Sequence, residues 1–206
     1  MSLEATHIRF ALELKDSYQI KNLPAYLAGA IYPDSRYVTT INRNLTHAEI
    51  CLNKNWADTD FKKGWQTHNI YDLKYKKISS LIFPDLFSQE NKKNWWLHST
   101  SIKILQDIND AQIIGIKKYL NYLDYALNPN GEDIAGVKKY NRMVKNIYKN
   151  KKPLEVEDYE NFIRLLPFEN GMADKILRQT KEFLNNPEII NKIKNLYQQT
   201  LGIIIK

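Results

Sequence analysis

The scarcity of turn-forming residues is the sequence feature that most restricts the fold of this chain. Seven glycines and seven prolines are spread over 206 residues, too few for the many tight turns of a fold built from short β-strands. Apolar residues instead recur three and four positions apart, as on one face of an α-helix. Because 43% of the residues are hydrophobic, such faces can bury a core, and the length suits one domain. We therefore predict an all-α fold, a single compact multi-helix bundle over residues 1–206.

The predicted helices follow this periodicity along the chain. Pro24 is compatible with a helix because backbone N–H groups in a first turn have no acceptor within the helix. Asp58 or Thr59 is the predicted N-cap of the fourth helix. Pro84 predicts a break, and "NPNGED" at 128–133 predicts a stop followed by a new helix start. The predicted helical segments are roughly 8–14, 23–30, 44–53, 57–78, 91–127, 133–149, 155–166, 171–184 and 187–203.

Lysine residues supply most of the positive charge. The chain has 30 Lys and Arg against 23 Asp and Glu, a net charge of +7. The lysines are dispersed in short groups such as "KKY" and "NKIKN", which is typical of solvated helix faces. The alternative is attraction to an anionic partner: a phosphate-containing small molecule, a lipid headgroup or nucleic acid. Nucleic acid is the weakest of these candidates because the basic residues form no stripe or recognition helix.

Cysteine content and the apolar runs restrict the setting of the protein. Cys51 is the only cysteine, so neither an intrachain disulfide nor a thiolate-rich zinc site is available. Any metal ion must be held by nitrogen and oxygen ligands. The N-terminal segment carries early charges without a long apolar run, and no run is long enough to span a bilayer. We therefore expect a cytoplasmic protein without a transmembrane segment.

Histidines and aspartates in the first third of the chain form the main candidate site. His68 and Asp72 are four residues apart in a predicted helix, so both side chains project from one face. His7, Asp34 and His47 lie on or beside other early helices. Separate helices commonly supply the ligands of a metal centre in a bundle. Imidazole and carboxylate are the ligands that zinc or iron requires when thiolates are absent.

Each of these residues also has a simpler interpretation. A lone histidine on a helix is more often a packing residue than a ligand. The pair His68 and Asp72 has the spacing of an ordinary exposed polar pair, and Asp34 after Pro33 can cap a turn or the next helix. The setting favours a metal site, because these residues lie at helix ends or on partly apolar helices. An unpaired imidazole or carboxylate is costly to bury there.

Four short motifs carry the five candidate ligands. They read "TH" at 6–7, "GAIYPD" at 29–34, "TH" at 46–47 and "GWQTHNIYD" at 64–72. Their order resembles the zinc-dependent phospholipase C family of bacteria, and specifically its broader cytoplasmic relatives. The resemblance covers roughly residues 4–75.

The resemblance implies a role for each of the five residues. Asp34, His47, His68 and Asp72 would bind one zinc ion, and His7 would bind a second ion that shares Asp72. In the family the metals lie at the centre of an all-α bundle, bind phosphate oxygens and activate a water molecule for attack on phosphorus. Asp34 would be the catalytic base for that water. Residues 1–127 would then form the metal-site half of the domain, and residues 131–206 its packing or lid helices.

The chain departs from the family pattern at a third metal. That metal requires two further histidines and a glutamate, and "LKYKKI" after Asp72 contains no histidine. His98 matches the second of these histidines, but Ile102 stands where the glutamate would be. We therefore expect one or two ions, of zinc or another divalent metal such as iron.

Basic and aromatic residues near the motifs are candidate substrate contacts. Arg36 and Arg43 lie between two of the predicted ligands, and a guanidinium fork matches phosphate oxygens. Surface ion pairs with Glu49 or Asp16 would explain these arginines equally well. His98 is a further candidate, as a general acid, an outlying ligand or a core residue. Four aromatic residues could line a pocket mouth or bind a quaternary ammonium group: Tyr32, Trp65, Trp95 and Trp96. Core packing is the commoner role of such residues.

The function that these features favour is metal-dependent hydrolysis of phosphoesters, with metal-bound water as the nucleophile. The substrate would be a phospholipid headgroup or a soluble phosphodiester or phosphomonoester. The alternative is a non-catalytic helical binding or scaffold module that retains a degenerate metal site. Other common catalytic signatures, among them a phosphate-binding glycine-rich loop and "HExxH", are absent from the sequence.

Overall fold

The structure, a computed structural model, describes residues 3–149, 153–166 and 168–202, and every regular element within these ranges is helical. The all-α prediction is confirmed for this part of the chain. No helix within these ranges is long and apolar enough to cross a membrane. The α-helices are α1 (Glu4–Leu14), α2 (Leu23–Ile31), α3 (Arg36–Thr39), α4 (Arg43–Thr46), α5 (Asp60–Ile82), α6 (Trp95–Ile114), α7 (Ile134–Tyr148), α8 (Glu160–Arg164), α9 (Met172–Leu184) and α10 (Pro187–Gly202). Short 3₁₀ segments are Tyr32–Ser35, Glu49–Leu52, Lys54–Trp56, Lys92–Asn94, Ile116–Asp124 and Val156–Tyr159.

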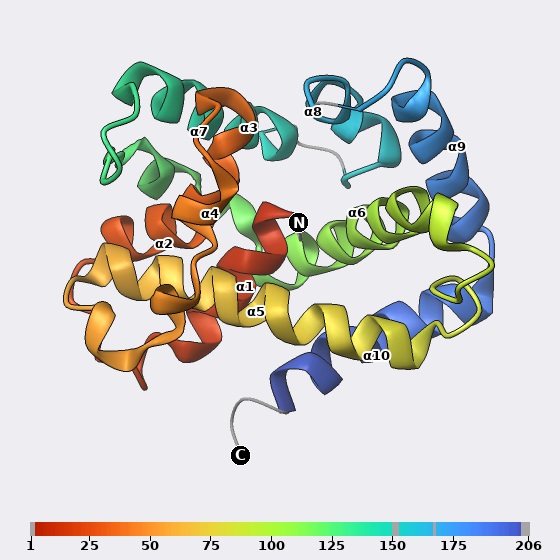
Figure 1. Cartoon of the computed structure of the whole chain (residues 1–206), viewed down its shortest axis with the longest axis horizontal. Coiled ribbons are helices and arrows are strands. Elements are labelled where there is room, and N and C mark those ends of the chain that lie inside the picture. The colour runs from red at the N-terminus through yellow and green to blue at the C-terminus, as the bar shows by residue number, and fades with distance from the viewer. Residues whose placement is uncertain (1–2, 150–152, 167, 203–206) are drawn as a thin grey trace.

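Helix α1 occupies the middle of the molecule and contacts α2, α5 and α6 (Figure 1). Helix α10 packs against α5, and α9 packs against α6. One large cluster of buried apolar side chains joins α1 to α2, α6, α7 and α8. A second cluster joins α1 to α5, α6 and α10. Because both clusters use α1, this helix is buried on nearly all sides.

Helix α1 has no side-chain cap of its own, and a residue from a distant helix takes that role. Leu3 stands at the N-cap position and offers no acceptor. Oδ1 of Asp107 on α6 accepts the backbone N–H of Thr6 at 3.0 Å, where the positive end of the helix dipole favours a carboxylate. The hydroxyls of Tyr148 and Tyr159 donate to Oδ2 of the same aspartate at 2.6 and 2.7 Å. This buried network fixes the position from which the α1 side chains project.

Two glycines allow α2 and α5 to approach until their backbones touch. A Cβ atom on Gly29 would lie 2.0 Å from the carbonyl oxygen of Phe61, and one on Gly64 would lie 1.9 Å from that of Tyr26. Neither position accepts a side chain unless a helix moves. The crossing places the C-terminal turn of α2, and the segment that follows it, beside the middle of α5. Both glycines belong to the sequence motifs described above.

The predicted helix over 44–53 is wrong, because α4 ends at Thr46. The backbone leaves the helical region at His47, with φ −126° and ψ 32°. The carbonyl of Thr46 accepts hydrogen bonds from Nε1 of Trp65 at 2.6 Å and from Nδ2 of Asn69 at 3.2 Å. Two α5 side chains thus replace the backbone donor that would have continued the helix. The local apolar pattern does not contain this long-range interaction.

The remaining helix boundaries differ from the prediction in smaller ways. The predicted helical stretch over 91–127 is interrupted at Gly115, whose φ of 60° ends α6. The predicted helix over 155–166 is a 3₁₀ turn followed by the short α8. The predicted cap Thr59 is confirmed, since its hydroxyl accepts the backbone N–H three residues later. Residue 203, at the end of the last predicted helix, lies outside the described ranges.

Replacing Gly64 by alanine is expected to destabilise the fold strongly, because the added methyl group would overlap the carbonyl of Tyr26. Overpacking typically costs ~1–3 kcal/mol and more when backbone must move, so we expect a loss of about 3 kcal/mol or more in the free energy of unfolding. Urea denaturation measures this loss. Gly202→Ala is the matched control, since nothing lies within 4 Å of its added Cβ. Equal stability of Gly64→Ala and the parent protein would contradict the close helix contact.

Candidate metal centre

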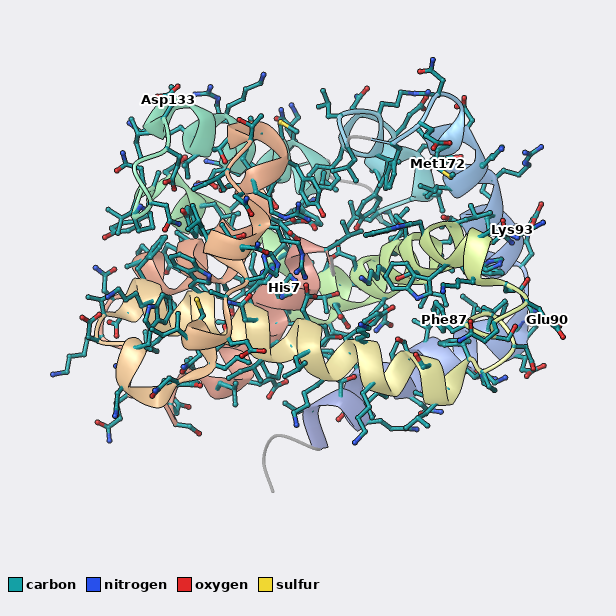
Figure 2. All side chains as sticks on the ribbon, viewed as in Figure 1. His7, Phe87, Glu90, Lys93, Asp133 and Met172 are labelled. Atoms are coloured by element: carbon teal, nitrogen blue, oxygen red, sulfur yellow. The ribbon has the colours of Figure 1, made fainter. Side chains whose placement is uncertain are left out.

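Five histidine and aspartate side chains from four segments converge in the interior of the molecule. His7 comes from α1 and Asp34 from the 3₁₀ segment after α2. His47 follows α4, and His68 and Asp72 lie on successive turns of α5. His7 lies near the middle of the molecule in Figure 2 and is almost fully buried. The five predicted ligands are therefore brought together, although they are spread over 66 positions of sequence, from 7 to 72.

The two oxygens of Asp72 divide this group into two parts. Oδ2 lies 3.8 Å from Nε2 of His47 and 3.8 Å from Nε2 of His68. Oδ1 lies 3.7 Å from Nε2 of His7. Oδ2 of Asp34 lies 3.9 Å from Nε2 of His68. A tetrahedral ion with bonds of about 2.0–2.1 Å keeps its ligands roughly 3.3 Å apart, so small movements would close one part around an ion with four ligands. The other part offers His7 and the shared Asp72.

The orientation of His68 depends on the contact between α2 and α5. Its Nδ1 atom lies 2.8 Å from the carbonyl oxygen of Ala30. Since a carbonyl only accepts, Nδ1 carries the proton and Nε2 presents its lone pair to the carboxylates. Ala30 lies in the last turn of α2, where carbonyl groups have no partner within the helix. The end of one helix thus fixes the tautomer of a ligand on the other, as outer partners of metal-binding histidines commonly do.

The orientation of His47 depends on the residue before it. The hydroxyl of Thr46 donates to the carbonyl of Arg43 at 3.3 Å, so it accepts a hydrogen bond from Nδ1 of His47 at 2.9 Å. Nε2 of His47 is then the atom that faces the carboxylates. Trp65 and Asn69 hold the carbonyl of Thr46, so α5 also fixes the backbone from which His47 projects.

Several of the candidate ligand atoms are buried without a hydrogen-bond partner. Within the described ranges, Nε2 of His7, Nε2 of His68 and both oxygens of Asp34 have none. Each unsatisfied buried polar atom costs about 1–3 kcal/mol, and several in one place call for an explanation such as an ion. A divalent cation bound among them would satisfy most of these atoms at once. The nitrogen and oxygen donors present fit zinc or iron, so these residues could hold a metal ion.

Burial keeps the three imidazoles neutral at physiological pH. It lowers the pKa of His47 to about 3 and the pKa of His68 to about 4. The pKa of His7 also lies well below its usual range, first through burial and then through the neighbouring His68. The rings of His7 and His68 stack with centroids 3.6 Å apart, so two positive charges there would repel each other. Neutral imidazole is the form that binds a metal ion.

The two carboxylates differ in their electrostatic surroundings. Burial raises the pKa of Asp34, although Arg36 opposes this shift with Nε 3.8 Å from Oδ1. Burial also acts to raise the pKa of Asp72, but nearby imidazoles and the ammonium of Lys103 contribute to holding it well below its usual range. Asp72 is therefore the more firmly anionic of the two, which suits a carboxylate shared between two parts of a metal centre.

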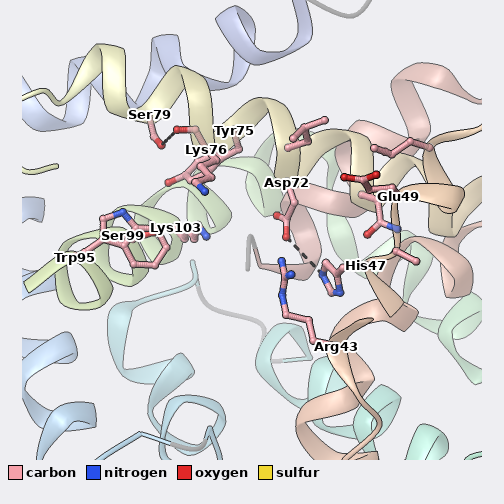
Figure 3. A pocket seen from close by; sticks show the side chains of 14 residues that line it. Arg43, His47, Glu49, Asp72, Tyr75, Lys76, Ser79, Trp95, Ser99 and Lys103 are labelled. Atoms are coloured by element: carbon pink, nitrogen blue, oxygen red, sulfur yellow. Dashed lines mark hydrogen bonds and ion pairs between the residues drawn. The ribbon is translucent and has the colours of Figure 1, made fainter. Parts of the chain in front are cut away.

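A cavity of about 480 Å³ opens beside Asp72 and His47 (Figure 3). Its volume suits a small organic ligand. Helix α6 contributes Trp95, Ser99 and Lys103 on successive turns of one face, opposite α5. All lining residues come from the predicted metal-site half, 1–127.

Of the three predicted substrate contacts, one lines the cavity and two do not. Arg43 lines the cavity, with its guanidinium group directed toward Asp72 (Figure 3). Arg36 does not line it, because it stacks on the ring of Tyr37 and pairs with Asp34. His98 is not brought to the group either. Its ring stacks on Phe183 of α9, with centroids 6.0 Å apart.

The four aromatic candidates also differ in whether they line the cavity. Trp95 lines the cavity. Tyr32 and Trp65 belong to a buried cluster at the α2–α5 contact, with ring centroids 4.7 Å apart. Trp96 is half exposed and packs edge-on against Trp95. Core packing is therefore the role of two of the four, and one faces the candidate site.

Glu4 is a buried acid near the centre that the motif analysis did not identify. The hydroxyl of Tyr140 donates to its Oε1 atom, and Oε2 has no partner within the described ranges. Burial, followed by repulsion from Asp34, raises the pKa of Glu4 well above its usual range. The available signal was its position three residues before His7, which places both side chains on one face of α1. Lys103 and Tyr75, which line the cavity, had no comparable signal.

No protein-family model, curated protein or solved structure matches this chain. The resemblance to the zinc-dependent phospholipase C family therefore stays a prediction that rests on the order of the motifs. The geometry of the centre is an independent observation.

Alanine at position 68 or 72 is expected to abolish metal binding, because each substitution removes an atom at the middle of the ligand group. Elemental analysis of the purified, tag-free protein should find near-stoichiometric zinc or iron in the parent and background amounts in both variants. His98→Ala is the control and should retain the metal, since its ring packs on Phe183. A parent protein that binds no metal, even after reconstitution, would contradict the metal centre.

The metal-free protein is expected to lose stability as the pH falls from about 6.5 toward about 4. Unfolded His68 takes up a proton near pH 6.5, whereas the folded residue resists protonation until about pH 4. The unfolded state therefore binds more protons in this window, which corresponds to roughly 3 kcal/mol for this residue. Urea denaturation across the window measures the slope, and His68→Gln should flatten it. An unchanged slope in that variant would show that His68 is not buried in its neutral form.

Proposed function

We propose that this protein is a metal-dependent hydrolase of phosphoesters. The observation that carries the proposal is the group of five histidine and aspartate side chains, several of whose ligand atoms lack partners, beside a cavity of about 480 Å³. A buried group of this composition, open to a ligand-sized space, is the arrangement expected of a catalytic rather than a purely structural metal site. The motif order favours the same conclusion, with zinc as the metal.

The residues of the centre would have different roles in such a reaction. His47, His68, Asp34 and one oxygen of Asp72 would hold one ion, and His7 with the other oxygen of Asp72 would contribute to a second. A divalent ion supplies a Lewis acid for a phosphoryl oxygen and lowers the pKa of a water molecule toward neutrality.

Asp34 is the proposed base. Its carboxylate oxygens have no hydrogen-bond partner within the described ranges, so one of them can accept the proton of the attacking water. The water oxygen forms the new bond to phosphorus, the ester bond breaks, and the leaving alkoxide takes up the proton that Asp34 has accepted. Arg36, 3.8 Å from Oδ1 of Asp34, keeps the carboxylate in place.

One observation favours a non-catalytic binding module as the second candidate. Within the described ranges, the ligand atoms grouped with His7 belong to His68 and Asp72, and both of these residues also lie beside the ligands of the other part. A centre that holds a single ion could bind phosphate without hydrolysing it. Bound metal in the absence of turnover would support this alternative.

Asp34→Asn is expected to reduce kcat for hydrolysis of p-nitrophenyl phosphate by about 100-fold or more, since loss of a general base typically costs 10²–10⁴-fold. The asparagine retains an oxygen ligand, so metal content should fall far less than activity. The assay follows p-nitrophenolate release by the zinc-loaded and iron-loaded proteins. Asp85→Asn, at an exposed position after α5, is the matched control. Metal-loaded parent protein that hydrolyses neither this ester nor bis-p-nitrophenyl phosphate would contradict the hydrolase proposal.

A further inference from the structure

Lys103 on α6 is a buried cation that forms no close ion pair with any residue that the structure describes. Its side chain is 7% exposed and lines the cavity beside the metal centre. Within the described part of the chain, its ammonium group lies 4.8 Å from the centroid of the Tyr75 ring and forms no ion pair. Buried lysines are rare unless they are paired. The charge of Lys103 therefore calls for an anion that enters the cavity.

The neighbours of Lys103 add donors suited to such an anion. The hydroxyl of Tyr75, on α5, is buried and has no hydrogen-bond partner in the described ranges. Arg43 reaches the same space from the opposite wall, so that its guanidinium group and the ammonium of Lys103 both point toward the opening beside Asp72 (Figure 3). An ammonium, a guanidinium and a hydroxyl make up the donor set that phosphate oxygens accept.

The charges of the metal centre strengthen the need for an anion. Asp34 and Asp72 together neutralise one divalent ion, while the imidazoles add no charge in their neutral form. A second ion, together with Lys103 and Arg43, would leave a strongly positive cavity. Positive charge that is confined and partly desolvated is costly until a multiply charged anion joins it.

We propose that Lys103, Tyr75 and Arg43 bind the non-reacting oxygens of a phosphomonoester dianion, and that the cavity selects phosphomonoesters over phosphodiesters with a cationic headgroup. The proposal rests on the proposed function of the metal centre and adds the substrate class. Trp95 lines the same cavity and could by itself attract a quaternary ammonium group. Lys103 and Arg43 oppose this binding, because they would place like charges in the same space.

The test compares two esters with the same leaving group, p-nitrophenyl phosphate and p-nitrophenyl phosphocholine. The metal-loaded parent protein should hydrolyse the monoester with the larger kcat/KM. Lys103→Met should lower kcat/KM for the monoester by roughly 10- to 100-fold, the range for a lost hydrogen bond to a charged group. It should raise kcat/KM for the choline ester, because the substitution removes a positive charge that repels the quaternary ammonium headgroup. Equal effects on both esters, or none on either, would overturn the proposal.

Calorimetric binding of inorganic phosphate to the metal-loaded protein separates this proposal from the hydrolase proposal. Phosphate binding that weakens in Lys103→Met, in a protein without turnover, would support the anion site while the hydrolase function fails. Turnover in the parent with unchanged phosphate affinity in Lys103→Met would support the hydrolase and overturn the anion site.

The controls address folding and metal content. Lys77→Met removes an exposed lysine of α5 outside the cavity. It should change neither the ratio of the kcat/KM values for the two esters nor the affinity for inorganic phosphate. Elemental analysis should find the parent's metal content in Lys103→Met. Should that variant fail to fold, Arg43→Gln at an exposed position provides the second test. Its kcat/KM for the monoester should fall relative to that for the choline ester, and an unchanged ratio would overturn the proposal.

Discussion

The backbone contact between α2 and α5 is the constraint on which the rest of the candidate site depends. It exists because Gly29 and Gly64 leave room for the carbonyl groups of the opposite helix. At this distance the imidazole of His68 reaches the carbonyl of Ala30, which sets its tautomer. The same crossing carries Asp34 alongside α5, within 3.9 Å of His68. A helix pair separated by ordinary side chains, 8–10 Å between axes, would separate the ligands of the two helices.

Helix α1 shows how the fold accommodates polar groups at its centre. Arg9 pairs with Asp110 at 2.6 Å and stacks on Tyr197, and the first-turn N–H of Thr6 bonds to Asp107. Both of these hydrogen bonds join residues 101 positions apart in sequence. His7 stands apart, since neither of its ring nitrogens has a hydrogen-bond partner in the described part of the chain. Like both oxygens of Asp34 and Nε2 of His68, these nitrogens are buried polar atoms that a bound ion would satisfy.

The electrostatic arrangement of the centre is costly to the free protein and suited to binding. Three imidazoles are held neutral by burial, two carboxylates lie among them, and Lys103 is buried without an ion pair to any described residue. Functional sites commonly retain such arrangements at the expense of stability, because preorganised charges and donors need not rearrange when a ligand arrives. The imidazoles and carboxylates match a cation, and the outer donors of the cavity match an anion. A phosphate group bridging the two would complete both.

The sequence by itself determined the helical class and the identity of the candidate ligands. Apolar spacing, few glycines and the cap at Thr59 are local properties, and the His68–Asp72 spacing places two ligands on one face wherever that helix packs. The tertiary structure decided which polar residues share a space. It ended α4 at Thr46 through side chains of α5, brought Lys103 to the cavity, and directed His98 and Arg36 away from it. These outcomes depend on contacts between residues far apart in the chain, and the side-chain period of a single helix carries no information about the helix it will meet.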